Sequence, residues 1–389
     1  MTDAILALNA GSSSIKFGLF EIDAAPRRIA GGEIEGIGTA PHFIARDAKG
    51  KIIGERRWPD ASEGHEALLG GLLEWVDAHL GGDTLVAVGH RVVHGGRDFT
   101  GPVRLDDKVL EALDRLTPLA PLHQPHSLSP VRAIMAVRPG LAQVACFDTS
   151  FHHTLPAVAT RFALPREYEA EGVRRYGFHG LSYEYIAGVL KRTAPELAAG
   201  RVIVAHLGNG ASLCALRDGV SIDTTMGFTA LDGLMMGTRC GTIDPGVILY
   251  MLQQKKLTAP QVETLLYQHS GLLGVSGISS DMRVLLESSA VEAREAVELF
   301  VFRIAREAAA LAGSLGGLDG FVFTAGIGEH AAEIRQAVGE RLAWLGVAID
   351  PAANTSHAER ISTADAQVEV RVIPTDEEAM IVRHTLETL

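Results

Sequence analysis

The sequence predicts an α/β protein of two domains, and three observations support this prediction. The chain of 389 residues is long enough for two domains with separate hydrophobic cores. Strand-like and helix-like apolar periods alternate along its whole length, as they do in α/β proteins. A strand, a glycine-rich turn and a second strand at residues 5–20 are echoed from residue 201, with Gly11 matching Gly208. This echo favours a duplicated core, although hairpins also resemble one another by chance.

The first half of the chain begins with strands and continues with helices. The apolar pattern predicts strands at 4–9, 15–21, 43–54 (with a turn at "DAKG") and 143–149, and helices at 62–80, 105–116 and 127–137. No low-complexity linker follows, so a boundary near residue 150 would be a hinge between packed domains.

The second half starts again with strands. We expect a strand–turn–strand from 201, a helix at 290–314, a strand over "GFVFTAGIG" (320–328), a helix at 330–345, a strand over "VEVRVIP" (368–374) and a terminal helix from 376.

Charge and cysteine usage exclude several classes of partner. The net charge of −12 and the pI near 5.7 argue against nucleic acid or an anionic membrane as the main partner. Cys146, Cys214 and Cys240 are far apart in sequence and form no CxxC pair, which is typical of a reducing compartment. No secretory signal is visible, and no apolar run approaches the ~18 residues that span a bilayer. We therefore expect a soluble cytoplasmic protein.

Three glycine-rich stretches follow apolar runs: "NAGSSSIK" (9–16), "HLGNG" (206–210) and "GIGEH" (326–330). A phosphate is bound by converging backbone N–H groups, and glycine lets the backbone approach it closely. None of the three is a Walker A loop. Each one alone is also explained by a hairpin turn or by the turn that opens a helix, but three in one chain favour phosphate binding.

"GIGEHA" also fits the G-x-G-x-x-A pattern of dinucleotide sites, with Asp350 about twenty residues further on as a ribose-binding acid. Only about sixty residues remain after Gly326, too few to complete a doubly wound six-stranded domain. An oxidoreductase is therefore the weaker interpretation.

Two arginines and two histidines lie in turn-rich segments. Arg91 in "GHRVVHGG" and Arg239 in "GTRCGTIDPG" suit phosphate or carboxylate, which a guanidinium binds through two parallel bonds. Each is equally compatible with a structural ion pair. "HRVVH" lacks the glutamate of a zinc-binding H-E-x-x-H helix. His123 in "PLHQPH" and His179 in "YGFHG" are site candidates, although a lone histidine there usually serves packing.

Carboxylates follow two apolar strands. Asp148 ends the strand at 143–149, where α/β folds often place a catalytic or metal-associated carboxylate. In "PTDEEAM" the spacing Thr375-x-x-Glu378 predicts a capping box, and Asp376 suits the helix dipole. This leaves Glu377 as the carboxylate best able to face a site, although capping alone would also explain the segment.

Taken together and in this order, the motifs resemble those of the acetokinase family, in the acetate- and sugar-kinase/actin-like superfamily. They are "NAGSSSIKF", "GHRVVHGG", "FDTSFH", "YGFHG", "HLGNGAS", "DTTMGFT", "GLMMGTR", "DPG" and "GIGE". The resemblance implies a two-domain actin-like ATPase fold with a duplicated mixed-sheet core and an active-site cleft between the domains. Residues 1–149 with 379–389 would form the domain of the phosphate turn and acyl substrate. Residues 150–378 would form the nucleotide domain.

The resemblance also implies the reaction ATP + acetate ⇌ ADP + acetyl phosphate, with Mg²⁺ (or Mn²⁺) and direct in-line transfer, for which positioning and charge neutralisation suffice. Arg91 and Arg239 would hold the carboxylate and the moving phosphoryl group, and His179 would donate to its oxygens. Asp148 would organise magnesium and its waters, without a firm role as general base, because acetate is already ionised at neutral pH.

The remaining implied residues fall into three groups. The metal-associated residues are Asn9 and Glu377. The acyl-substrate residues, besides Arg91, are Val93, Leu122, His123 and Phe178. The nucleotide-binding residues are Ser12, Ser14, Lys16, His206, Leu207, Gly208, Asn209, Gly210, Asp281, Met282, Arg283, Gly326, Ile327, Gly328, Glu329 and His330. Members of the family are generally homodimers, so we expect a homodimer here.

The chain departs from the usual motifs at Gln124, Ala230, Asp232 and His330. Ala230 replaces a proline of the acyl-pocket wall, so propionate is an alternative substrate. His330 replaces an asparagine in the adenosine-facing loop, so a pyrophosphate-dependent relative also remains open. A non-catalytic actin-like scaffold would share the fold but would not need these arginines, histidines and carboxylates.

Overall fold

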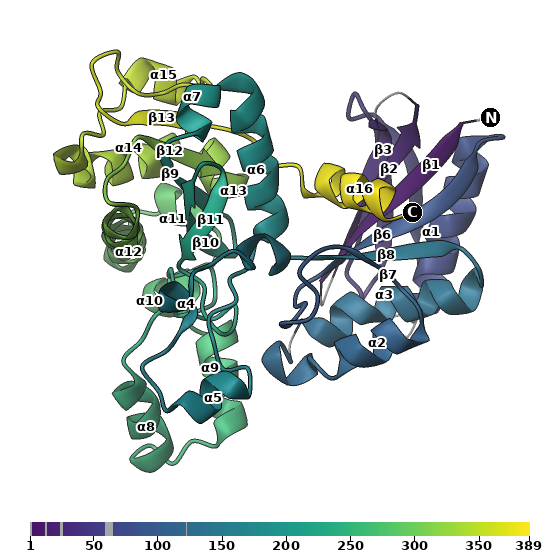
Figure 1. Cartoon of the computed structure of the whole chain (residues 1–389), viewed down its shortest axis with the longest axis horizontal. Helices are drawn as coiled ribbons and strands as arrows, with labels where there is room; N and C mark the ends of the chain where they lie inside the picture. The colour runs from purple at the N-terminus through teal and green to yellow at the C-terminus, as the bar shows by residue number, and fades with distance from the viewer. Residues whose placement is uncertain (1, 12–13, 24–25, 59–64, 122) are drawn as a thin grey trace. The chain divides into compact units, whose positions relative to one another are not determined.

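The chain divides into two compact units. The computed structural model describes residues 2–11, 14–23, 26–58, 65–121 and 123–389. The first unit comprises Met1–Phe151 and Asp376–Leu389, and the second comprises His152–Thr375. Each unit has its own mixed sheet and its own helices (Figure 1). The reaction role expected for each domain stays a prediction.

Within the described residues, the sheet of the first unit has the strand order β5-β4-β3-β2-β1-β6-β8-β7. Strand β1 is antiparallel to β2 and parallel to β6, which in turn is parallel to β8. The strands are β1 (Asp3–Ala10), β2 (Ser14–Ile22), β3 (Pro26–Glu35), β4 (His42–Asp47), β5 (Ile52–Arg57), β6 (Thr84–Val92), β7 (Val103–Arg104) and β8 (Ala142–Phe147). The stretch expected at 43–54 forms β4 and β5, with the expected turn at "DAKG" between them, whereas β3 was not expected.

Helices cover both faces of this sheet (Figure 1). On one face, α1 and α3 bury the alternate residues Leu6 and Leu8 of β1 and Phe17 of β2. On the other face, α16 packs on β1, β6 and β8. It lies so close that a Cβ at Gly89 would come within 2.3 Å of the Thr385 hydroxyl. The helices are α1 (His65–Leu80), α2 (Asp107–Asp114), α3 (Gln124–Val137) and α16 (Glu377–Thr388), with short turns η1 (Thr117–Leu119) and η2 (Ser150–His152).

The sheet of the second unit repeats the central part of the first. Its order is β11-β10-β9-β12-β13 over the part of the chain described. The successive pairs are antiparallel, antiparallel, parallel and parallel, as they are in β3-β2-β1-β6-β8. The sequence echo therefore reflects a repeated topology. The strands are β9 (Arg201–Leu207), β10 (Ala211–Arg217), β11 (Val220–Thr224), β12 (Gly320–Thr324) and β13 (Glu369–Val372).

The long helix α12 packs on β9, β10 and β11, and α6 contacts β9 from the other side of the sheet (Figure 1). The helices of this unit are α4 (Ala157–Thr160), α5 (Arg166–Ala170), α6 (Gly180–Thr193), α7 (Pro195–Ala198), α8 (Pro245–Gln253), α9 (Ala259–Gln268), α10 (Gly271–Ser276), α11 (Met282–Glu287), α12 (Val291–Leu315), α13 (Ala325–His330), α14 (Ala332–Arg341), the short turn η3 (Ala343–Leu345) and α15 (Pro351–Thr355).

Two local predictions about the segment after β12 need correction. The strand expected at 320–328 ends at Thr324, and "GIGEH" forms the short helix α13 rather than an open turn. Asp350 has a structural role, because its carboxylate accepts from the N–H groups of Ala352 and Ala353 and so caps α15. Asp350 is therefore occupied as a helix cap, which removes the ribose-binding acid that an oxidoreductase would need.

The capping box predicted at Thr375 and Glu378 is wrong. Asp376 is the N-cap of α16, and its carboxylate accepts from the N–H of Ala379 at 2.9 Å. The Glu378 carboxylate instead accepts from Arg28 on β3 at 3.1 Å. Sequence spacing could not reveal this competing partner, which lies 350 residues away along the chain.

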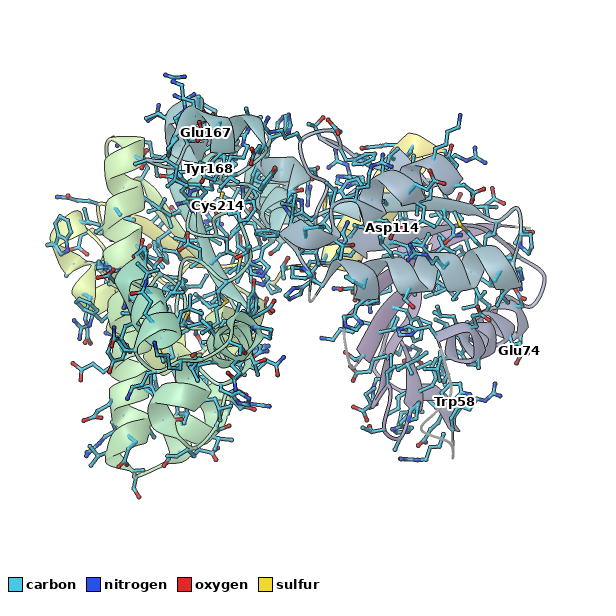
Figure 2. The ribbon with its side chains drawn as sticks, turned by 90° about the horizontal axis from the view of Figure 1, so that it is seen from below. Trp58, Glu74, Asp114, Glu167, Tyr168 and Cys214 are labelled. Carbon is cyan, nitrogen blue, oxygen red and sulfur yellow. The ribbon has the colours of Figure 1, made fainter. Side chains whose placement is uncertain are left out.

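Two of the three cysteines lie in the cores of the two units. Cys146 and Cys214 are buried, and no disulfide joins the three cysteines, all of which are described; Figure 2 marks Cys214 in the second unit. Among the described residues, no helix combines the length and apolar character needed to cross a membrane.

Candidate active site

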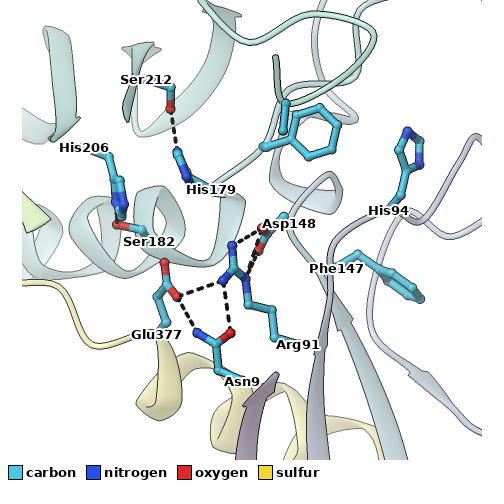
Figure 3. Close-up of polar contacts among 12 residues, drawn as sticks. Asn9, Arg91, His94, Phe147, Asp148, His179, Ser182, His206, Ser212 and Glu377 are labelled. Atoms are coloured by element: carbon cyan, nitrogen blue, oxygen red, sulfur yellow. Dashed lines mark hydrogen bonds and ion pairs between the residues drawn. The ribbon is translucent and has the colours of Figure 1, made fainter. Parts of the chain in front are cut away.

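In the first unit, the carboxyl ends of three parallel strands bring polar side chains together. Asn9 lies on β1, Arg91 on β6, and Asp148 directly follows β8, so that all three reach one edge of the sheet. Arg91 Nε donates to Asp148 Oδ1 at 2.9 Å, and Nη2 donates to Oδ2 at 2.5 Å (Figure 3). This is a bidentate pair, and the Asp148 side chain is only 1% exposed.

Asn9 and Glu377 complete this cluster (Figure 3). Arg91 Nη1 donates to Asn9 Oδ1 at 3.0 Å, and Asn9 Nδ2 donates to Glu377 Oε2 at 3.2 Å. Glu377 Oε2 also lies 3.9 Å from Arg91 Nη1. Burial acts to lower the pKa of Arg91, but the carboxylates of Asp148 and Glu377 outweigh it and raise that pKa. The guanidinium therefore stays charged.

The donor set of this cluster fits magnesium. Carboxylate and amide oxygens are its preferred protein ligands, and it is usually held by one or two carboxylates together with substrate phosphates. Asn9, Asp148 and Glu377 supply such oxygens. Within the described ranges, no group of three or more His, Cys, Asp or Glu side chains is arranged to hold a metal; waters and substrate phosphate oxygens commonly supply the other ligands of Mg²⁺.

In the second unit, two imidazoles lie face to face. His179 and His206 have ring centroids 4.1 Å apart and planes 20° apart. His179 Nδ1 is 2.8 Å from Ser212 Oγ, which is 2.5 Å from the Tyr183 hydroxyl. His206 Nδ1 is 2.9 Å from Ser182 Oγ (Figure 3). Hydroxyl groups thus fix the plane of both rings.

His152 hydrogen-bonds to the backbone of the turn that carries His179. His179 has φ 58°, a left-handed conformation at the N-cap of α6. Burial lowers the pKa of His152 to about 4, so this imidazole is neutral. Since a carbonyl only accepts, His152 Nε2 donates to Phe178 O at 2.9 Å, and Nδ1 accepts from Ser221 Oγ at 2.8 Å.

Arg239 lies close to His179 across a glycine. Arg239 Nη1 donates to the carbonyl of Ala230 at 2.6 Å. A Cβ added to Gly210 would lie 2.7 Å from Arg239 Nη2 and 3.2 Å from His179 Nε2. The second unit therefore brings Arg239, His179 and the "HLGNG" turn together, and a side chain at position 210 would displace the end of Arg239.

A cavity of about 720 Å³ adjoins this turn, a volume within the usual range for small-molecule sites. Eight of the predicted nucleotide-binding residues line it: Gly208, Asn209, Asp281, Met282, Arg283, Gly326, Ile327 and His330. Asp281 caps α11 by accepting from the N–H of Arg283, and the two side chains form an ion pair at 2.6 Å. His206, Leu207, Gly210, Gly328 and Glu329 lie in the same segments but do not line the cavity.

The other predicted contacts stay predictions. Ser14 and Lys16 lie on β2, where Lys16 pairs with Asn9 in the ladder. Val93 and Phe178 are buried, and His123 is partly exposed. Val93 and His123 belong to the first unit and Phe178 to the second. Ser12 and Leu122 lie outside the described residues.

One departure from the family motif proves structural. Gln124 is fully buried. Its Nε2 donates to the carbonyls of His94 and Leu113, and its Oε1 accepts from the N–H of His94. It ties the loop after β6 to α2.

Sequence reasoning missed the residues that orient the histidines, namely Ser182, Tyr183 and Ser212. A signal for one of them was present, because Ser212 is directly opposite His206 in the β9–β10 hairpin. Alternation along the hairpin places both on one face. Ser182 and Tyr183 lie on α6, and nothing in the sequence indicates which strand that helix covers.

The repeated sheets, the arginine–carboxylate cluster and the cavity beside glycine-rich loops define a two-domain α/β phosphotransferase. The profile of the acetokinase family matches residues 4–383. The chain belongs to this family, as its motifs predicted.

Relatives and solved structures agree with this assignment. The acetate kinase of Rhodopseudomonas palustris (strain TIE-1) is 56% identical over 99% of this chain and 98% of its own. The acetate kinase of Nitrobacter hamburgensis is 51% identical over 100% of this chain and 96% of its own. A propionate kinase from Francisella tularensis subsp. tularensis SCHU S4 superposes with a TM-score of 0.92 at 36% identity, covering 100% of both chains. The structure of an acetate kinase from Porphyromonas gingivalis superposes with a TM-score of 0.86 at 34% identity, covering 99% of both chains.

Proposed function

We propose that the protein catalyses the reversible transfer of a phosphoryl group from ATP to acetate, giving acetyl phosphate and ADP. The Arg91 cluster with Asn9, Asp148 and Glu377 carries this proposal. It combines a fixed guanidinium for carboxylate or phosphoryl oxygens with oxygens suited to Mg²⁺. The two acetate kinases quoted above match this chain over nearly the full length of both proteins.

In-line phosphoryl transfer needs positioning and charge neutralisation rather than covalent catalysis. Magnesium, when bound, would neutralise phosphate charge, with Asn9 and Glu377 holding it; Mn²⁺ has the same preference for oxygen. Arg91 and Arg239 hold acetate and the moving group, and His179, oriented by Ser212, donates to its oxygens. Asp148 is engaged with Arg91, and acetate needs no base, so Asp148 orients rather than deprotonates.

The nucleotide occupies the cavity between the "HLGNG" turn, the start of α11 and α13. The cavity lining offers an anionic ligand Arg283, His330 and the glycine backbone at Gly208 and Gly326, alongside the carboxylates of Asp281, Glu287 and Glu333. We further propose that the protein is a cytoplasmic homodimer, as expected for the family; light scattering of the purified protein tests the dimer.

The choice of acid depends on Ala230. The carbonyl of Ala230 holds Arg239, and a proline would keep that carbonyl while adding bulk. The structure of a propionate kinase superposes as well as those of acetate kinases, so propionate is the second candidate. We favour acetate because the relatives with the highest identities quoted above are acetate kinases.

A hydroxamate assay for acyl phosphate tests these choices, with acetate, propionate and butyrate in parallel and with ATP or pyrophosphate as donor. We expect ATP-dependent turnover, with kcat/KM for acetate at least about tenfold above propionate, about 1.4 kcal/mol of discrimination. Ala230→Pro is expected to increase that ratio further. A preference for propionate would reassign the acid, and turnover with pyrophosphate alone would reassign the donor. Folded protein that forms no acyl phosphate would contradict the kinase itself, and filaments would then favour a scaffold.

A further inference from the structure

The four residues around the start of α16, Thr375 to Glu378, each have a separate anchor. The Thr375 N–H donates to Glu329 Oε1 at 3.2 Å, and the Asp376 carboxylate accepts from Ala379 N. Glu377 accepts from Asn9, and Glu378 accepts from Arg28. The first of these anchors belongs to the second unit and the others belong to the first. Thr375 is therefore the last anchored residue of the second unit, two residues before Glu377 in the chain.

The Glu329 carboxylate holds two distant backbone positions at once. Its Oε1 accepts from the N–H of Ala325 at 2.8 Å as well as from that of Thr375. Ala325 begins α13 directly after β12, whereas Thr375 follows β13. One oxygen thus ties the start of the nucleotide-lining helix to the segment that leaves the unit.

The position at Ala325 needs such a restraint. Its φ of +63° is left-handed, a conformation that costs energy for any residue with a Cβ and persists only where its surroundings impose it. The bond to Glu329 holds its N–H in place. Gly326 and Ile327, which come next, line the 720 Å³ cavity, so the same bond sets where this wall of the cavity begins.

Glu329 is poorly suited to bind nucleotide itself. Its side chain is 16% exposed, and it does not line the cavity, unlike Gly326, Ile327 and His330. A carboxylate pointed at phosphates would repel them, since like charges at close range are unfavourable.

We propose that Glu329 is a positioning residue, which couples the α13 wall of the nucleotide cavity to the backbone at Thr375, two residues before Glu377 in the chain. The inference rests on the proposed function. This positioning role stands in place of the nucleotide contact that the "GIGE" motif led us to expect for Glu329. Glu329 acts through these two backbone N–H groups and lies 3.9 Å from Nε2 of the exposed His330. Because Glu329 itself does not line the cavity, we expect its effect to fall more on the transfer step than on nucleotide affinity.

Two variants and a matched control test this role. Glu329→Ala removes the acceptor, whereas Glu329→Gln keeps an oxygen at the same place and removes only the charge. Glu298→Ala is the control, because Glu298 is an exposed carboxylate of the same unit, 74% exposed and paired with Arg341. For each protein we would measure MgADP binding by calorimetry, kcat by the hydroxamate assay, and hydrogen exchange of the Ala325 and Thr375 amides.

We expect Glu329→Ala to lower kcat about 10–100-fold, as outer residues that orient a site commonly do, while the Kd for MgADP changes less than about threefold. The Ala325 and Thr375 amides should exchange faster. Glu329→Gln should restore kcat and amide protection, and Glu298→Ala should match the wild type.

A tenfold weaker MgADP affinity with unchanged kcat would overturn the proposal, as would equal amide exchange in Glu329→Ala and wild type. If Glu329→Ala does not fold, Glu329→Gln decides: retained kcat and protection support the role, and lost kcat with retained protection overturns it. Should the wild type form no acyl phosphate, the proposed function fails, and the amide exchange still tests the backbone link by itself.

Discussion

The carboxyl ends of the two repeated sheets carry different kinds of chemistry. In the first unit, the strand ends carry Asn9, Arg91 and Asp148, which are bonded to one another. In the second unit, the equivalent strands β9 and β12 end at Leu207 and Thr324, and neither strand end carries an arginine or a carboxylate. There the chain continues into glycine-rich segments around a 720 Å³ cavity.

The comparison shows that the shared topology places the strand ends at one edge of each sheet. The residues at those strand ends then decide what the edge can bind. The first edge is saturated with mutual bonds, so its groups are fixed before any ligand arrives. The second edge retains unmet bonding capacity, for example the buried Thr324 hydroxyl, which has no hydrogen-bond partner among the described residues. We expect changes at the first edge to affect both stability and chemistry, and changes at the second to affect chemistry more selectively.

Arg91→Ala should have the largest effect. It removes the bidentate partner of Asp148, whose side chain is 1% exposed, and breaking a buried pair costs about 3–5 kcal/mol. Acyl phosphate formation should fall by at least about 100–1,000-fold, the cost of losing one preorganised charge-stabilising donor. Denaturant unfolding and the hydroxamate assay measure the two effects.

Arg132→Ala is the matched control for Arg91. Arg132 pairs with Asp114 in the same unit, but both side chains are 46% exposed, so its loss should cost less than about 1 kcal/mol. Equal unfolding free energies for the two variants would show that the Arg91 cluster is not the rigid edge inferred here.

The second largest effect should be the loss of folding stability at acid pH. Burial lowers the pKa of His90, His94 and His152 from 6.5 to about 4. The unfolded chain binds these protons more readily, so stability is complete above about pH 6.5 and falls as the pH drops towards 4. Each histidine contributes up to roughly 3 kcal/mol of this loss.

Glu378 opposes this trend, because burial raises the pKa of its carboxyl and acid therefore favours its folded state. Urea unfolding at pH 7.5 and pH 5 measures the sum. Since His90 and His94 belong to the first unit and His152 to the second, the loss should be larger in the first. His152→Gln keeps a donor for Phe178 O and should flatten the slope for the second unit. An unchanged slope would contradict a buried neutral His152.

Ser212→Ala should have the smallest and most selective effect. The change frees His179 Nδ1 from its hydroxyl partner at 2.8 Å, and kcat should fall about 10–100-fold, as for other orienting residues. Affinity for MgADP, measured by calorimetry, should stay unchanged because Ser212 does not line the nucleotide cavity. Ser314→Ala, which removes an exposed bond to Asp223, is the control. A parallel loss of nucleotide affinity would mean that the hairpin, rather than the imidazole, was disturbed.

Much of this arrangement was predictable from residues close in sequence. The turns after β1 and β9 and the long helix α12 follow from apolar period and glycine placement. Sequence motifs alone were enough to single out Arg91, Asp148, His179 and Arg239. Their number and order, rather than any one motif, made the family recognisable.

The errors occurred where a distant partner outweighs a local preference. Strand β3 was missed because "PRRIAGGEIE" carries charges and adjacent glycines, yet β2 and β4 pair with it on both sides. The capping box failed because Arg28 binds Glu378. Helix α13 was missed because glycine disfavours helices, and the Glu329 bond to Ala325 was not visible in the sequence.

Helix α16 belongs to the first unit but follows the whole second unit in the chain. A ribosome therefore releases β6 and β8 long before the helix that covers Gly89 and Cys146 is made. That apolar sheet face stays bare on the nascent chain while the second unit is translated, a period in which unpaired surface invites aggregation or chaperone binding. The part of the protein that is made first therefore cannot complete its fold until the whole second unit has been made.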